Sequence, residues 1–548
     1  MKPIRIGELL KEKGVITEKQ VNISLAQQRI TGNLLGDTLI KLGFVSSREI
    51  AEIMAGQAGL EFFDINQYSI SEDALKLIPK DVAEKSGFVP LSIDNGILSI
   101  GVGNPSNILA VDVVTRLTKK APVIYLVDEA IIGDVIERAY FFLENPIQKQ
   151  IEVLINTVKS SGTASGPTVT SLTDLIIIDA IRKHATDVHI NPEADVFNVM
   201  YRIDGVLQYG HCLPKLCQSG IVSRIKILSQ LDIAEQRLPQ DGSFSYAALK
   251  KSYDMRVSTV PAMHGENVVI RILAGSVSML NIGALGFNPP DVRKIKTVFN
   301  KPYGIILIVG PTGSGKTTTL YAALREVNLL EKNVLTVEDP VEYRLSFVKQ
   351  TQVNEKAGYD FALAGRNFMR QDPDVMLLGE IRDEETAKIA IRASITGHLV
   401  LSTLHSNDAV TSIPRLLDFN VDRFMLSASL LAVMAQRLVR KICRFCKSEY
   451  ALNDEERQFF REFGMEAGKV FKGKGCEKCN DTGYAGRTAI GEIFLVDDNI
   501  RELIYSAASI NTVKEAAIKN GMKPFRADAL RKVAEGVTTM DEVMRVAG

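Results

Sequence analysis

The sequence lacks an excess of charge of either sign. Lys plus Arg and Asp plus Glu number 65 each among 548 residues, so the formal net charge is zero. A chain that binds nucleic acid through its overall charge carries a clear basic excess, and only local basic patches remain open here. We therefore expect no nucleic-acid partner.

Long apolar runs and abundant cysteine are missing as well. No uncharged apolar run approaches the ~20 residues that cross a bilayer, and residues 1–14 are charged and have no apolar signal core. We expect a cytoplasmic protein that reaches a membrane only through a partner or a surface contact. Of six cysteines, Cys212 and Cys217 stand apart and four form two CxxC pairs. In a reducing compartment that spacing favours a metal over disulfides.

A glycine-rich loop is the most informative feature that is present. It lies between an apolar run, 305–309, and a segment of helical character, 318–327. Its residues are Gly310, Pro311, Thr312, Gly313, Ser314, Gly315, Lys316 and Thr317, followed by Thr318. Glycines let backbone N–H groups surround phosphate oxygens, and the helix N-terminus adds a favourable dipole. Lys316 is expected to reach the β- and γ-phosphates and Thr317 to hold Mg²⁺, which predicts a nucleoside triphosphate site.

Three later apolar runs carry polar residues at their carboxyl ends, where open parallel sheets place their ligands. These residues are Glu338, Glu380 and His405. Hydrolysis of a triphosphate needs a positioned metal and an oriented water. We assign Glu338 to the water and Glu380 to Mg²⁺, with the reverse as the alternative. His405 taken alone could equally be a satisfied polar core residue.

Residues 172–285 alternate between helix and strand patterns, and two arginines interrupt apolar strands. They are Arg256, within 253–260, and Arg271, within 267–273. Arginine rarely faces a core without a partner. Either the two residues form salt bridges on the solvated face of a sheet, or they are cations directed at the triphosphate.

The two CxxC pairs are Cys443 with Cys446 and Cys476 with Cys479, and the long stretch 447–475 separates them. Four thiolates at such knuckles can surround Zn²⁺ tetrahedrally and leave no open coordination position, which is typical of a structural site. The long spacing predicts an insertion between the knuckles. The alternative is four unpaired thiols.

The N-terminal residues contain a repeat at an offset of 29. Gly7 aligns with Gly36 and Gly14 with Gly43, and each unit reads as helix, glycine turn, helix. The glycine after the first helix fits a C-cap, and Ser46 or Ser47 caps the next helix with Glu49 close behind. A structural duplication that binds nothing is the alternative. Residues 160–167 are rich in Ser and Gly, which indicates a flexible linker.

Several of these segments strongly resemble GspE/PilB-type secretion ATPases, a resemblance that covers residues 172–548. The resemblance depends on the stretches 185–190 and 232–242, the acidic segment Glu338 to Glu342, the segment Asp374 to Glu380, and the pair His398 and His405. The resemblance implies an α/β multidomain chain that uses ATP, Mg²⁺ and Zn²⁺, with Arg256 and Arg271 reaching the nucleotide. It also implies a homohexamer, peripheral to the bacterial inner membrane, that acts on a membrane platform protein.

The repeat resembles the MshEN domain, which binds cyclic di-GMP in that family. The departures lie in aliphatic replacements of leucines and in the second unit, which has no arginine before Leu35. The expected organisation is a helical-repeat N-terminal module (1–145), a flexible linker (146–171), a PAS-like α/β middle domain (172–285) and a RecA-like P-loop ATPase domain (286–548) with a zinc-binding insertion at 443–479.

Among functions, pilus assembly is favoured, with type II secretion as the alternative. A nucleic-acid translocase and a nucleotide-signal sensor are the rivals from other classes.

Overall fold

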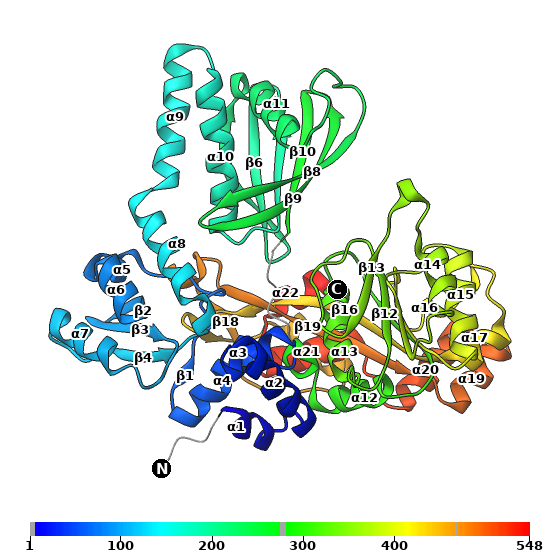
Figure 1. Cartoon of the computed structure of the whole chain (residues 1–548). Coiled ribbons are helices and arrows are strands. Elements are labelled where there is room, and N and C mark those ends of the chain that lie inside the picture. The colour runs from blue at the N-terminus through cyan, green and yellow to red at the C-terminus, as the bar shows by residue number, and fades with distance from the viewer. Residues whose placement is uncertain (1–5, 274–280, 467, 548) are drawn as a thin grey trace. The chain divides into compact units, whose positions relative to one another are not determined.

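The protein is described by a computed structural model that covers residues 6–273, 281–466 and 468–547 (Figure 1). Its contacts divide it into two units. One unit joins Met1–Ile50 to Ser278–Gly548, and the other spans Ala51–Val277. The predicted module of residues 1–145 is thus shared between the two units.

The N-terminal repeat forms two helix pairs, as predicted. The helices are α1 (Ile6–Glu12), α2 (Glu18–Thr31), α3 (Leu35–Lys41) and α4 (Ser47–Ala58). Gly14 and Gly43 take left-handed φ angles of 69° and 73° at equivalent turns, a conformation that glycine adopts without strain. Ser46 Oγ accepts the backbone N–H of Glu49, so Ser46 is the cap.

Residues 61–144 form a small sheet with the strand order β1-β4-β3-β2 and flanking helices. The strands are β1 (Glu61–Phe62), β2 (Phe88–Asp94), β3 (Ile97–Val102) and β4 (Val123–Leu126), and the helices are α5 (Glu72–Leu77), α6 (Lys80–Ser86), α7 (Ile108–Thr118) and α8 (Ile132–Glu144). Asn95 and Gly96, with φ angles of 53° and 72°, turn the β2–β3 hairpin. Asn-Gly is the pair typical of a two-residue hairpin turn.

The predicted flexible linker is wrong for most of its length. Residues 147–161 form α9 (Ile147–Ser161), and α10 (Gly166–Arg182) begins well before residue 172, the expected start of the middle domain. Of residues 146–171, only Pro146 and residues 162–165 are non-helical. Gly162 ends α9 in a left-handed conformation and Ser165 caps α10. The residues that suggested a linker are therefore helix caps, which share the composition of linkers.

The middle domain is an antiparallel sheet of order β7-β6-β5-β10-β9-β8. Its strands are β5 (Asp187–Pro192), β6 (Val196–Ile203), β7 (Val206–Pro214), β8 (Gln240–Ala248), β9 (Lys251–Ala262) and β10 (Gly265–Leu273). Helices α9, α10 and α11 (Gln218–Leu228) lie together along this sheet (Figure 1). One sheet face is thereby buried in an apolar core, and the other remains available to polar side chains.

The motor domain is a seven-stranded sheet of order β13-β12-β14-β15-β11-β16-β19. Its strands are β11 (Gly304–Val309), β12 (Val334–Glu338), β13 (Val348–Gln352), β14 (Val375–Leu378), β15 (Leu399–Leu404), β16 (Leu430–Ile442) and β19 (Tyr484–Leu495). All neighbours pair in parallel except β16 with β19. The carboxyl ends of β11, β12, β14 and β15 therefore share one edge, which is the expected place for a ligand.

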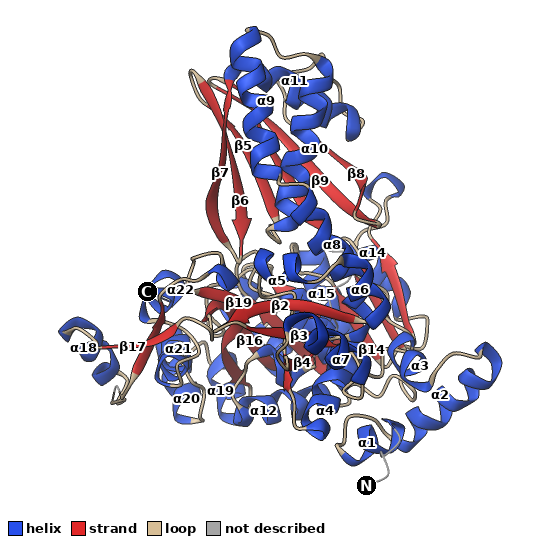
Figure 2. Ribbon diagram, turned by 90° about the vertical axis from the view of Figure 1, so that its left-hand side faces the viewer, coloured by secondary structure: helices blue, strands red, loops and turns tan. Residues whose placement is uncertain are grey.

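Helices cover both faces of the motor sheet. Ile305, Leu307 and Val309 of β11 pack on one side, while Ile306 and Ile308 pack on the other, with α13 (Lys316–Glu326). This alternation follows from the period of two along a strand. The β17 (Lys447–Tyr450) and α18 (Asp454–Glu462) segments follow β16 in the chain and lie outside the seven-stranded sheet (Figure 2). Among the described residues, no helix combines the length and the apolar character needed to cross a bilayer.

Candidate nucleotide-binding site and cysteine cluster

The predicted P-loop has the backbone that phosphate binding requires. It leaves β11 at Gly310 and enters α13 at Lys316, with Thr317 and Thr318 in the first turn of the helix. Gly313 and Gly315 have φ angles of 78° and 87°. A Cβ on Gly310 would lie 2.5 Å from the carbonyl oxygen of Gln436. The loop thus needs glycine for its conformation and for its close approach to a neighbouring strand.

Polar groups of the loop point to a phosphate ligand. Lys316 Nζ donates to the carbonyl oxygens of Gly310 and Pro311, at 2.8 and 3.2 Å. Ser314 Oγ is buried and has no hydrogen-bond partner within the described part of the chain. Burial lowers the pKa of Lys316, while the Glu380 carboxylate raises it. An amine at the start of a helix and an unsatisfied hydroxyl are groups that would suit a triphosphate.

The side chain of Gln436 braces the P-loop through hydrogen bonds, a role that sequence reasoning missed. Its Nε2 donates to Ser314 O at 2.8 Å, and its Oε1 accepts from Thr319 Oγ1 at 2.6 Å. The side chain is 1% exposed at the middle of β16. The available signal was an amide that directly follows the apolar run 430–435, because a buried polar group requires partners.

Glu380 and His405 meet beside the P-loop. Glu380 follows β14 and His405 follows β15, and His405 Nε2 lies 3.6 Å from Glu380 Oε2. Arg382 also forms an ion pair with Glu380. Burial and the Lys316 cation lower the pKa of His405, and Glu380 opposes them. The net shift favours the neutral form of His405. His398 differs, because its Nδ1 bonds to Ala393 O at 2.8 Å at the end of α15 (Glu384–Ile395).

Glu338 ends β12 in a different environment. It is 5% exposed and accepts three hydrogen bonds: one from Tyr321 Oη, one from Thr336 Oγ1 at 2.6 Å and one from Gln350 Nε2 at 3.2 Å. Hydrogen bonding to Glu338 thus ties α13, β12 and β13 together. Sequence reasoning placed Glu338 at the strand end but missed the side chains that surround it.

Arg256 and Arg271 are neighbours on the middle-domain sheet. They face each other across β9 and β10 in register, and both are exposed. Arg271 Nε donates to Asp187 Oδ1 at 2.9 Å, so the salt-bridge alternative holds for this residue. Among the described residues, Arg256 has no carboxylate partner. Like charges directly opposite each other on a sheet repel, and Asp187 offsets only the charge of Arg271.

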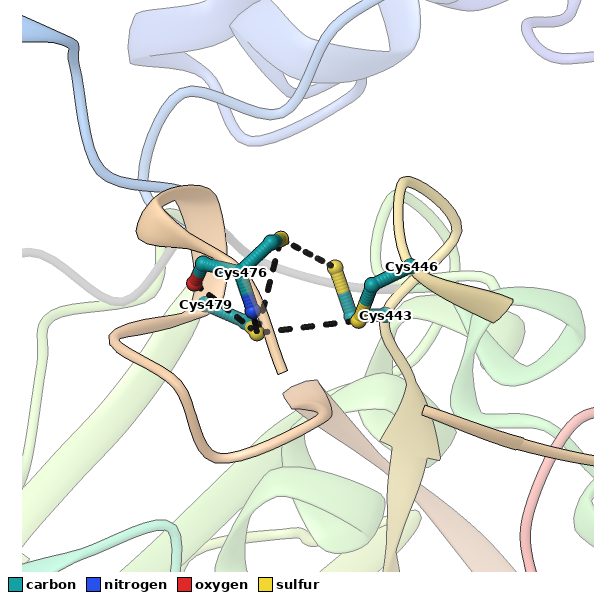
Figure 3. Close-up of side chains that lie close together, drawn as sticks. All are labelled: Cys443, Cys446, Cys476 and Cys479. Carbon is teal, nitrogen blue, oxygen red and sulfur yellow. Dashed lines mark hydrogen bonds between the residues drawn. The ribbon is translucent and has the colours of Figure 1, made fainter. Parts of the chain in front are cut away.

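The four paired cysteines form one cluster in the motor domain (Figure 3). The Sγ atoms of Cys443 and Cys476 lie 3.8 Å apart, those of Cys446 and Cys479 lie 3.9 Å apart, and all four lie within 4.8 Å of one another. Tetrahedral Zn²⁺ with Zn–S bonds of about 2.3 Å places its sulfurs about 3.8 Å apart. The cluster therefore has the spacing of a metal site.

Local backbone contacts also suit thiolate ligands. The N–H groups of Cys476 and Gly483 each donate to Cys479 Sγ at 3.3 Å. Burial raises the pKa of Cys443 and of Cys476. At Cys479 these donors and the neighbouring thiols outweigh burial, and the pKa falls below its usual value. The cysteines of the cluster lie in the connection between β16, which ends at Ile442, and β19, which begins at Tyr484. The cluster therefore lies at the end of this strand pair.

Comparison with known proteins agrees with this geometry. The family model described as "Type II/IV secretion system protein" matches residues 163–545, and the model of the MshEN domain matches residues 58–142. The MshEN match begins after most of the N-terminal repeat. It covers the small sheet and its helices rather than the two helix pairs on which the resemblance was based.

Two curated relatives align over almost the whole chain. The type IV pilus assembly ATPase PilB of Myxococcus xanthus (strain DK1622) is 38% identical, covering 98% of both chains. The type II secretion system protein E of Xanthomonas campestris pv. campestris is 37% identical, covering 99% of this chain and 98% of its own.

A solved structure supports the fold alone. The ATPase DotB of Yersinia pseudotuberculosis superposes with a TM-score of 0.50 at 19% identity, covering 69% of this chain and 93% of its own. The predicted α/β multidomain fold is thereby confirmed. With a P-loop, strand-end carboxylates and a family match over most of its length, the chain belongs to the type II/IV secretion system family of ATPases.

Proposed function

We propose that this protein hydrolyses ATP to drive type IV pilus assembly at the bacterial inner membrane, working as a ring of six copies on a membrane platform protein. The observation that carries the proposal is the P-loop cradle with Lys316 beside Glu380 and His405. The near full-length similarity to a pilus assembly ATPase supports the choice of process.

Each residue of the site takes a distinct role in this proposal. The P-loop N–H groups and Lys316 bind the phosphates. Thr317 and Glu380 hold Mg²⁺, which when bound neutralises charge on the phosphoryl oxygens. Glu338 orients the attacking water, and the reverse assignment of the two glutamates remains the alternative. Neutral His405, next to Glu380, donates a hydrogen bond toward the γ-phosphate.

The middle-domain arginines complete the site when that domain closes on the motor. Arg256 and Arg271 bring two positive charges on one rigid sheet face. Charge of this kind stabilises the transition state of phosphoryl transfer. Closing and opening with each turnover would convert hydrolysis into domain rotation, which is a known class of switching movement.

Zn²⁺ is the proposed occupant of the cysteine cluster, where it would be structural. Four thiolates satisfy its tetrahedral preference and leave no position for a substrate. We expect about one Zn²⁺ per chain by elemental analysis. The Cys476→Ser variant should lose the metal and have a lower Tm, whereas Cys212→Ser, at an exposed cysteine outside the cluster, should keep both. Metal-free protein with an unchanged Tm would contradict this role.

Cyclic di-GMP is the proposed ligand of the N-terminal repeat, by the resemblance of its two helix pairs to MshEN domains and by the MshEN match that follows them. Titration calorimetry of the full chain with cyclic di-GMP tests this proposal. Absence of both heat and a shift in Tm would remove the ligand but leave the ATPase proposal intact.

Type II secretion is the second candidate, because a secretion protein E is as similar as the pilus ATPase in identity and coverage. Replacing the chromosomal gene with the Lys316→Ala variant separates the two processes. Loss of surface pili with normal secretion of exoproteins is the expected result, and the opposite pattern would assign the chain to secretion.

The biochemical test is phosphate release by the purified chain. Wild-type protein should hydrolyse MgATP and Lys316→Ala should not, because the loop loses its only lysine. DNA binding should be weak over a salt series. Tight, salt-dependent DNA binding would favour the nucleic-acid translocase instead.

A further inference from the structure

The two units of the N-terminal repeat differ at one residue of their helix caps. In the first unit, the side chain of Gln20 accepts the N–H of Thr17 at 2.7 Å, and Thr17 Oγ1 accepts the N–H of Gln20 at 3.3 Å. At the equivalent position of the second unit, Glu49 accepts the N–H of Ser46 at 2.7 Å in the same arrangement. Both residue types complete a capping box. The cap therefore does not explain why the second unit has a carboxylate.

The additional contacts of Glu49 lie in the segment Ser278–Gly548 of its own unit. Arg325 Nη2 donates to Glu49 Oε2 at 3.0 Å, and Asn281 Nδ2 donates to Glu49 Oε1 at 2.7 Å. The side chains of Arg325 and Glu49 are 11% and 12% exposed. Burial would raise the pKa of Glu49, but Arg325, Asn281 and Ser46 together hold it below its usual value. This is a partly buried, charge-assisted contact, which is stronger than a surface ion pair.

A second contact of the same unit is aromatic. The Phe44 ring stacks on Phe347 with a centroid distance of 5.7 Å and an interplanar angle of 5°. Next to it, Ser346 Oγ donates to Lys41 O at 3.1 Å. The position equivalent to Phe44 in the first unit is Val15, so this aromatic ring is also specific to the second unit.

Both contacts reach elements that build the nucleotide site. Arg325 lies in the last turn of α13, whose first residue is Lys316. Phe347 directly precedes β13, whose Gln350 donates to Glu338. The second repeat unit therefore touches the far end of the P-loop helix and the segment that fixes one strand-end carboxylate.

We propose that docking of the second repeat unit, through Glu49 on Arg325 and Phe44 on Phe347, sets the nucleotide affinity of the P-loop, so that the repeat regulates the motor domain of its own chain. The proposal rests on the proposed ATPase function. Docking holds α13 and the segment before β13 in place, which pre-organises the site and strengthens binding. Because coupling is reciprocal, a ligand that moves the repeat changes nucleotide affinity, and nucleotide changes its affinity for the repeat.

The test measures the Kd of the full-length chain for the magnesium complex of a non-hydrolysable ATP analogue. Glu49→Gln and Phe44→Val should each raise Kd about fivefold or more, the lower end of usual coupling between sites. The matched control is Lys19→Gln. Lys19 belongs to the first unit and pairs with Glu331 of the motor at 2.9 Å, but both side chains are more than half exposed. Its Kd should match that of the wild type.

A double-variant comparison separates docking from misfolding. Arg325→Gln alone should resemble Glu49→Gln, and the two changes together should cost no more than either one, because they remove the same contact. Wild-type Kd values in both Glu49→Gln and Phe44→Val would overturn the proposal while leaving the ATPase function standing. A wild-type chain that binds no nucleotide would overturn both.

Discussion

At the scale of single residues, the two strand-end glutamates have become distinguishable. Glu338 accepts hydrogen bonds from three side chains of its own domain, whereas Glu380 lies beside Lys316, His405 and Arg382. The sequence spacing predicts that both glutamates lie at one sheet edge, but it does not predict which side chains surround each of them. The donors to Glu338 come from α13, β12 and β13, and only the folded sheet brings them together.

This difference predicts that one substitution costs both stability and turnover at Glu338 but turnover alone at Glu380. Glu338→Gln places an amide against hydroxyl and amide donors, so it should lower stability by about 1–3 kcal/mol. Glu380→Gln should leave Tm nearly unchanged and reduce turnover by about 100-fold or more. Thermal unfolding and phosphate release check both. A Glu338→Gln variant that keeps its Tm and loses turnover would favour a role at the water alone, and an active Glu380→Gln variant would exclude Glu380 from the site.

A second residue-scale prediction concerns pH and the C-terminal helix α22 (Met540–Ala547). Glu542 is 1% exposed and bonded to Arg440 and Arg545. Burial would raise the pKa of Glu542, but these arginines outweigh it and lower the pKa to about 2 from 4.5. A carboxyl group whose pKa is lower in the folded than in the unfolded chain stabilises the fold at pH values above the unfolded pKa. That stability is lost as the pH falls from 4.5 toward 2.

The contribution of Glu542 amounts to about 3 kcal/mol above pH 5. Wild-type Tm should therefore fall steeply between pH 5 and 3, and Glu542→Gln should start from a lower Tm and fall less steeply. Thermal unfolding of both proteins over this range is the measurement. Parallel profiles would show that Glu542 does not carry this pH dependence.

At the scale of elements, β16 connects the P-loop to the cysteine cluster. Gln436 in the middle of the strand braces Ser314 and Thr319, and Cys443 follows the last residue of the strand. The glycine pattern predicts the P-loop locally. It cannot predict the brace, because Gln436 comes from a strand much further along the chain that pairs in parallel with β11.

The brace predicts that Gln436 supports nucleotide binding from outside the phosphate site. Gln436→Ala leaves Ser314 O and the Thr319 hydroxyl unpaired in a buried place, which should lower stability by about 1–3 kcal/mol and raise the Kd for nucleotide. Gln436→Glu should also raise Kd, because a carboxylate accepts from Thr319 but cannot donate to Ser314 O. Equilibrium binding and Tm measure these effects, and wild-type Kd values in both variants would exclude the brace.

At the scale of the whole molecule, sequence patterns predicted the fold class and the site strands well, because each depends on local periodicity and strand-end chemistry. The sequence predictions were wrong where the same amino-acid composition is typical of two different structures. The Ser- and Gly-rich stretch at 160–167 caps two helices instead of forming a long linker. The repeat was expected to belong with the residues that follow it, yet Met1–Ile50 groups with the motor, through contacts between segments far apart in the sequence, such as Glu49 with Arg325. Local patterns carry no information on such pairs.

The proposed role of the middle-domain arginines gives a prediction at the scale of the whole molecule. Arg202, Asp187, Arg271 and Arg256 form one row across β6, β5, β10 and β9. If Arg256 and Arg271 act on the transition state after closure, replacing both by Ala should lower kcat by about 1000-fold. The Kd for nucleotide should change little, because the P-loop alone holds the phosphates. Arg202→Ala, which removes the arginine at the other end of the row, should keep near wild-type turnover. Equal losses in Kd and kcat would instead place the arginines in ground-state binding, and unchanged turnover in the double variant would leave them as surface charges and remove the mechanical link between the domains.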